Sequence, residues 1–153
     1  MKTLQVGNGD LQKDSGGRLQ FVQGNSKLLQ DLTLWLKENY GIGFTTPNFG
    51  STLPAMVGSA ITRSSMNEIQ AEVQRVITLY QTQQFLALRQ AQTTSQLANW
   101  NKSEIINSIN SINVSSDPYT SYGNVQVAVS LTTLAGSSVD LTVFIDSNGI
   151  QAK

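Results

Sequence analysis

Few residues in this sequence could do acid–base or nucleophilic chemistry. Its 153 residues include ten Asp and Glu, but no His and no Cys. The absence of His removes the commonest general base and the Ser-His-Asp triad. The absence of Cys removes thiolate nucleophiles, disulfides and Cys-based zinc sites. Glycoside hydrolysis remains open, because it needs only two carboxylates about 5–9.5 Å apart.

Glu68 and Glu72 are the carboxylates whose spacing best fits that chemistry, since they lie one turn apart on a predicted helix. Acidic residues near the start of a helix also have a structural explanation, because the helix dipole favours them there. No acidic residue is paired with an apolar pocket that would raise its pKa, and none has calcium-loop spacing. We therefore predict no catalytic residue, no metal and no other cofactor. A peptidoglycan-degrading muramidase is the enzymatic alternative.

Charge is sparse and balanced along the chain. Ten Lys and Arg stand against ten Asp and Glu, and 13% of residues are charged, about half the usual share of roughly 25%. A neutral, amide-rich surface repels neighbours poorly, which favours a subunit packed within an assembly. There is no basic patch for nucleic acid and no apolar run of roughly 18 residues for a membrane span. We expect one soluble domain over residues 1–153, without a cleaved leader and without nucleic-acid or membrane partners.

The first 40 residues divide into an arm and a helix. Turn residues punctuate residues 1–25 and predict an irregular arm or hairpin. A helix is expected from Ser26, with Gly41 as its left-handed stop. Its apolar stripe includes Leu28, Leu32, Trp35 and Tyr40.

Residues 41–50 predict a shaped loop, because two glycines and a proline occur within ten residues. The loop lacks the glycine and lysine pattern of a phosphate-binding motif. We expect Phe44 and Phe49 to enter the core, and a short helix to follow within residues 51–60.

A long helix is predicted over residues 65–100, which contain neither Pro nor Gly. The spacing of Ser65 and Glu68 suits a capping box. About 30 helical residues would span roughly 45 Å, so the second half is expected to project from a domain of this size. This half either contacts a helical bundle of another subunit or bends back onto its own domain. The candidate helix interface consists of Tyr80, Gln84, Leu88 and Trp100, with Phe85 and Leu86 as further apolar points.

The last third of the chain changes to a strand period. A strand is expected around residues 109–114, and residues 125–131 and 139–145 alternate between apolar and polar residues. The turn around Gly136 joins the latter two strands as a hairpin. We predict an α+β fold in which N-terminal helices, one of them long and central, pack on a C-terminal antiparallel sheet that ends in this hairpin. The last strand is expected to form a sheet edge, guarded only by Asp140 and Asp146.

Several short motifs resemble one family. Gly9-Asp10-Leu11, Gly17-Arg18-Leu19 and the helix beginning near Leu28 come first, followed by residues 40–53. Within the last stretch, Pro47-Asn48-Phe49-Gly50-Ser51 is the most specific. Together they resemble the baseplate wedge proteins of contractile-tailed bacteriophages, a family related to the tail-sheath initiator and often labelled "lysozyme-like". The residues of the motif loop are Gly41, Gly43, Pro47, Phe49 and Gly50.

The resemblance implies a structural part of the virion, assembled in the host cytoplasm. Its partners would be the tail sheath protein and other wedge or tube proteins, with several copies in a six-fold ring around the tube. The family requires no catalysis and offers C-terminal strands for strand exchange with the first sheath ring. By this resemblance, the joint would involve Val125, Val127, Val129, Leu131, Val139, Leu141, Val143 and Ile145.

This sequence departs from the family after the first part of the long helix. Typical members carry a Glu-Pro-Arg motif there for contacts with neighbouring wedge components. Residues 80–84 read Tyr-Gln-Thr-Gln-Gln instead, with no Pro or Glu. A longer helix with a different bundle contact is the expected replacement.

Overall fold

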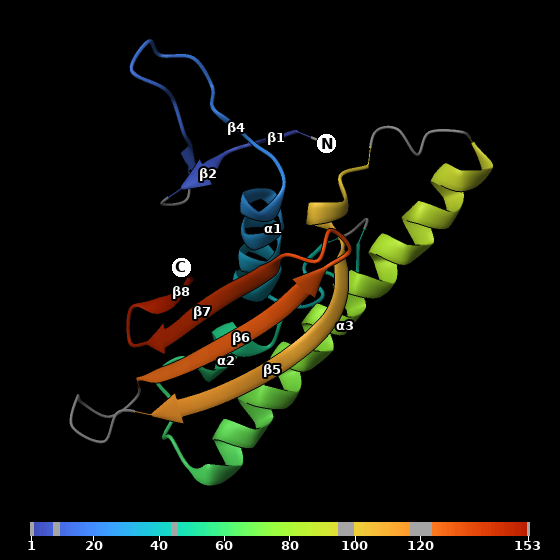
Figure 1. Cartoon of the computed structure of the whole chain (residues 1–153). Coiled ribbons are helices and arrows are strands. Elements are labelled where there is room, and N and C mark those ends of the chain that lie inside the picture. The colour runs from blue at the N-terminus through green and yellow to red at the C-terminus, as the bar shows by residue number, and fades with distance from the viewer. Residues whose placement is uncertain (1, 8–9, 44–45, 95–99, 117–123, 153) are drawn as a thin grey trace.

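The structure is a computed structural model that describes residues 2–7, 10–43, 46–94, 100–116 and 124–152. Helices α1 (Asn25–Lys37), α2 (Leu53–Met56) and α3 (Arg63–Thr93) precede a C-terminal sheet (Figure 1). The sheet contains β5 (Ile106–Ser116), β6 (Val125–Thr133), β7 (Ser138–Asp146) and β8 (Gly149–Ala152), in that spatial order and antiparallel throughout. The predicted α+β class is confirmed.

The core lies between one face of the sheet and the helices. Apolar side chains alternate along β6 and β7 and are buried, whereas the residues between them are polar or small, apart from Phe144. Leu28, Leu32 and Leu36 of α1 and Val73, Val76 and Ile77 of α3 meet this face. The predicted hairpin is therefore confirmed, with Val129 opposite Leu141 and Leu131 opposite Val139.

β5 follows an unusual period of three. Its sequence begins with two Ile-Asn-Ser triplets, whereas side chains in a regular strand alternate with a period of two. The pairing with β6 shifts register between Ile106 and Ser108 and again between Ile109 and Ser111. Each shift inserts an extra residue, so Ile109 and Ile112 both pack toward the core.

Helix α1 ends earlier than predicted. It stops at Lys37, and Tyr40 is exposed instead of completing the apolar stripe. The chain leaves the helix because the backbone groups of Glu38 and Tyr40 bond to Ser51 instead. The Ser51 amide donates to Glu38 O (2.8 Å), and the Ser51 carbonyl accepts from Tyr40 N (2.9 Å). Gly41 does adopt a left-handed φ of 81°, but it lies four residues beyond the end of the helix.

Helix α3 begins one turn before the expected capping box. The box consists of Thr62 and Ser65: Thr62 Oγ1 accepts from Ser65 N, and Ser65 Oγ accepts from Thr62 N. Glu68 instead accepts a bond from Ser64 Oγ at 3.3 Å. The helix runs unbroken for 31 residues to Thr93, about 46 Å, which contradicts a bend back onto the domain before that point. The expected continuation through residues 95–99 lies outside the described residues.

The N-terminal arm, predicted over residues 1–25, contains three short antiparallel pairings that meet at one point. β1 (Thr3–Leu4) pairs with β4 (Phe21–Val22), β2 (Val6–Gly7) pairs with β3 (Asp10–Leu11), and Lys13 bridges Leu19. At the centre, three backbone bonds form a ring: Gln5 N to Gln20 O, Gln20 N to Gln12 O, and Gln12 N to Gln5 O. Gln30 of α1 tethers the arm through Leu4 O and Val6 N, both at 2.9 Å. The arm extends from the start of α1 (Figure 1).

Candidate assembly interface

The open stretch of sheet edge lies on β7. Thr133 N donates to Ser137 O at the hairpin turn, and this bond sets which residues of β7 bond to β6. Hydrogen-bonded and non-hydrogen-bonded pairs alternate in an antiparallel ladder. The backbone groups of Val139 and Leu141 therefore face β6, whereas those of Ser138, Asp140 and Thr142 point away from it.

β8 covers part of this edge. It pairs with residues 143–146 of β7 across the two-residue turn Ser147–Asn148. Among the described residues, positions 138–142 have strand neighbours in β6 alone. Three consecutive outward positions, Ser138, Asp140 and Thr142, thus have no β-strand partner there. An unpaired row of this kind is a template for an added strand.

The eight side chains predicted for strand addition are core residues. None is more than 4% exposed, and all belong to the cluster beneath the helices: Val125, Val127, Val129, Leu131, Val139, Leu141, Val143 and Ile145. β6 cannot accept a strand, because it is paired with β5 on one side and β7 on the other. The hairpin's last strand, predicted to be a sheet edge, is one only over residues 138–142, since β8 covers nearly half of β7. The available groups belong to the backbone of the residues between the predicted ones.

Two of the four predicted helix-interface residues have partners within the chain. Tyr80 is 9% exposed, and its hydroxyl donates to Asp31 Oδ2 at 2.8 Å. Burial, together with the nearby Asp31 carboxylate, raises the pKa of Tyr80 well above its usual value. Gln84 donates to Glu104 O (2.6 Å) and accepts from Ile106 N (3.0 Å), joining α3 to the start of β5.

Other residues form the apolar surface near the end of α3. Leu88 and Trp100 are half-buried, whereas Phe85 and Leu86, outside the predicted set, are 40% and 55% exposed. Gln81 contacts the first residues of β5, so the helix beyond Gln84 runs past the end of the sheet (Figure 1). The helical period was the available signal, because Phe85 and Leu86 lie off the buried stripe through Ile77, Tyr80 and Gln84.

The motif loop is fixed to the helices by its backbone. Gly50 has a φ of 97°, and a Cβ there would lie 2.6 Å from Asn39 O, so this position requires glycine. Ser51 follows with its hydroxyl donating to Leu36 O at 2.6 Å. Phe49 packs edge-on against Trp35, with ring centroids 4.8 Å apart, as predicted. Phe44 lies outside the described residues.

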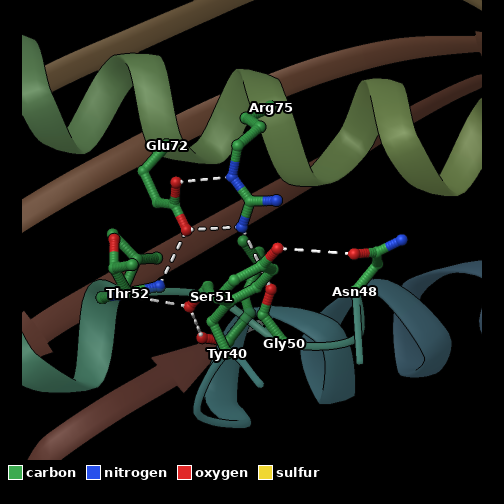
Figure 2. Close-up of polar contacts among 9 residues, drawn as sticks. Tyr40, Asn48, Gly50, Ser51, Thr52, Glu72 and Arg75 are labelled. Atoms are coloured by element: carbon green, nitrogen blue, oxygen red, sulfur yellow. Dashed lines mark hydrogen bonds and ion pairs between the residues drawn. The ribbon is translucent and has the colours of Figure 1, made fainter. Parts of the chain in front are cut away.

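A bidentate ion pair fastens this loop to α3. Arg75 donates through Nε and Nη2 to the two carboxylate oxygens of Glu72, both at 2.8 Å. Figure 2 shows the Glu72 carboxylate between this guanidinium and Thr52, whose amide donates to it at 2.7 Å. Arg75 also donates to Gly50 O at 3.2 Å and lies over the Tyr40 ring. The hydrogen bond with Arg75 is the main cause of the lowered pKa of Glu72.

The remaining motif residues shape the loop and its surface. A Cβ on Gly43 would lie 2.8 Å from Thr46 Oγ1, and Pro47 is exposed. Tyr40 and Ile42 are 46% and 70% exposed, and the Arg75 guanidinium lies over the Tyr40 ring. The loop thus presents an aromatic and an apolar side chain to solvent.

Glu68 and Glu72, the two carboxylates of the muramidase alternative, have different surroundings. Glu72 is held ionised by Arg75, whereas a glycosidase acid needs a raised pKa. Glu68 is exposed at the start of α3. Within the described part of the chain, no three His, Cys, Asp or Glu side chains are grouped to hold a metal ion. None of the described helices has the length and apolarity to cross a bilayer.

No family model matches the chain, and comparisons with curated proteins and with solved structures also give no match.

Proposed function

We propose that this chain is a structural subunit of a contractile phage tail baseplate, which links wedge proteins around the tail tube and accepts a strand that begins the sheath. The observation that carries the proposal is the open edge at residues 138–142 of β7. Its placement within the baseplate rests on the motif resemblance. The neutral, sparsely charged composition also suits a subunit covered by its neighbours.

The incoming strand binds mainly through its backbone. Ser138, Asp140 and Thr142 each turn an N–H and a carbonyl outward, and alternate positions in a strand lie roughly 6.6 Å apart. The tail sheath protein supplies this strand. It lies end to end with β8 along the β7 edge. Asp140 is the only charged residue in this stretch, so a neutral or basic strand is favoured.

The far part of α3 supplies the second contact of the proposed subunit. Phe85 and Leu86 are exposed on turns that run beyond the sheet, and burying them against a helix of a wedge protein would be favourable. This contact replaces the one that typical family members make through Glu-Pro-Arg. Copies of the chain would form a six-fold ring in the virion baseplate, after assembly in the host cytoplasm.

Replacing Asp140 with proline tests the strand joint. The backbone N–H of Asp140 points away from β6, so Asp140→Pro removes an edge donor without breaking the β6–β7 ladder. We expect the variant to keep its far-UV circular dichroism but to capture co-expressed sheath protein at least about tenfold less well, because the donor is lost and the ring obstructs the edge. Asp140→Ala, the matched control, keeps full capture. Equal capture by both variants would contradict strand addition at this edge.

A further inference from the structure

The two borders of the sheet are built differently. The β7 border has an open stretch, whereas α3 runs along β5 at the opposite border and packs chiefly against that strand (Figure 1). Gln84 of α3 accepts from Ile106 N at the start of β5, and two further glutamines of α3 donate to the β5 backbone. Gln70 Nε2 donates to Ile112 O at 3.2 Å. Gln81 Nε2 donates to Ile106 O at 3.2 Å and to Asn107 O at 2.9 Å.

The spacing of these contacts matches the geometry of both elements. Gln70 and Gln81 are eleven residues apart, about 16 Å along a helix and three turns round it. Asn107 and Ile112 are five residues apart, also about 16 Å along a strand. The helix and strand run in opposite directions over this distance. The side-chain amides thus occupy backbone carbonyls that a further strand would use.

The composition of β5 explains why such a cover is needed. Its eleven residues include no charged residue and no proline, which are the usual devices that protect an edge strand. Its alternation is irregular, and a weakly patterned strand accepts several pairing registers. Uncovered, β5 would be a site for pairing between copies of the chain.

We infer that α3, through Gln70 and Gln81, closes the β5 border, so that the sheet can be extended only at its β7–β8 border. The chain can therefore accept a strand at the β7 edge, but its β5 strand cannot pair with a strand of another copy. This consequence rests on the proposed function: each subunit would accept one strand of the sheath protein at β7, and its sheet would end at β5. The closure of β5 does not depend on the proposed function, because it involves contacts within one chain only.

Disulfide trapping in the full chain tests this closure. The chain has no cysteine, so Asn113→Cys provides a single reporter at an exposed position on β5. The reporter is placed in Gln70→Ala/Gln81→Ala and in a control, Gln74→Ala/Gln83→Ala, which changes two exposed glutamines of the same helix. Ala has the highest helix propensity, so α3 is retained in both proteins.

After mild oxidation without any partner, we expect about tenfold more linked dimer from Gln70→Ala/Gln81→Ala than from the control. Light scattering before oxidation should show the same difference in self-association. The single variant Gln81→Ala, which loses two of the three bonds made by Gln70 and Gln81, should give an intermediate amount. Equal dimer yields in all three proteins would overturn the inference. Since no sheath protein is present, this result is independent of sheath capture by Asp140→Pro, whose failure would count against the proposed function alone.

Discussion

Gly50 provides the sharpest test of how the motif loop is held. In Gly50→Ala, a left-handed residue gains a side chain at a φ of 97°, which costs about 1–2 kcal/mol in the folded state. The new Cβ would also lie 2.6 Å from Asn39 O and 2.8 Å from Glu38 O. Because both are backbone atoms, they must shift, at a further cost of about 1–3 kcal/mol. The total predicted loss of unfolding free energy is about 2–5 kcal/mol.

Gly41 is the matched control. Its φ is 81°, but a Cβ there would meet nothing within 4 Å, so Gly41→Ala should cost only the conformational term, about 1 kcal/mol. At roughly 2–4 °C per kcal/mol for a chain of this size, Gly50→Ala should lower Tm by about 4–20 °C and Gly41→Ala by less than about 5 °C. Urea unfolding followed by circular dichroism gives the free energies directly.

The comparison separates the close backbone approach from glycine's conformational freedom. Both variants carry the conformational cost. Gly50→Ala alone also disturbs the backbone hydrogen bonds that Ser51 makes with Glu38 and Tyr40 just after α1. Equal destabilisation of the two variants, within about 0.5 kcal/mol, would refute the reasoning for Gly50.

Three further predictions concern β7, Glu72 and catalysis. In the isolated chain, hydrogen exchange followed by NMR should be fast at the outward amides of Ser138, Asp140 and Thr142 and slow at Val139 and Leu141 between them; uniform protection would contradict an open edge. The lowered pKa of Glu72 contributes stability above its unfolded-state value near 4.5, and this is lost as pH falls through the folded pKa. Urea unfolding from pH 6 to pH 3 should therefore reveal a steeper loss in the wild type than in Glu72→Gln, and parallel curves would count against the ion pair. The purified chain should not clear peptidoglycan in a turbidity assay; clearing that Glu68→Gln or Glu72→Gln abolishes would support the muramidase instead.

The local patterns of this sequence predict the hairpin and α3 well. Strict alternation leaves β6 and β7 few choices of face, and a stretch without Gly or Pro favours one long helix. The end of α1 could not be predicted in this way. It depends on Ser51, which lies fourteen residues beyond Lys37 and bonds to the chain just after the helix.

Residues with non-local partners explain the other errors. The sequence predicts that Tyr80 and Gln84 contact another subunit, but Asp31 and the start of β5 satisfy their polar groups within the chain. The sequence pattern does not predict β8, because a strand of four residues is too short to show a clear alternation. The preceding Ser147–Asn148 turn and Gly149, with a φ of 114°, were the signals for its hairpin.

The open edge itself was predicted only in part. The sequence placed it on the last strand of the hairpin, but the direction of each backbone group depends on the phase of the ladder. That phase is set by the bond between Thr133 and Ser137 at the turn, and the alternation of apolar and polar residues does not specify it.

The most direct test of the central claim is a reconstruction of intact contractile-tailed particles that carry this chain. We predict that copies lie in a ring at the junction of baseplate and sheath, with a strand of the sheath protein hydrogen-bonded along residues 138–142 of β7. A chain placed elsewhere in the particle, or a β7 edge that meets only solvent at that junction, would contradict the proposed function.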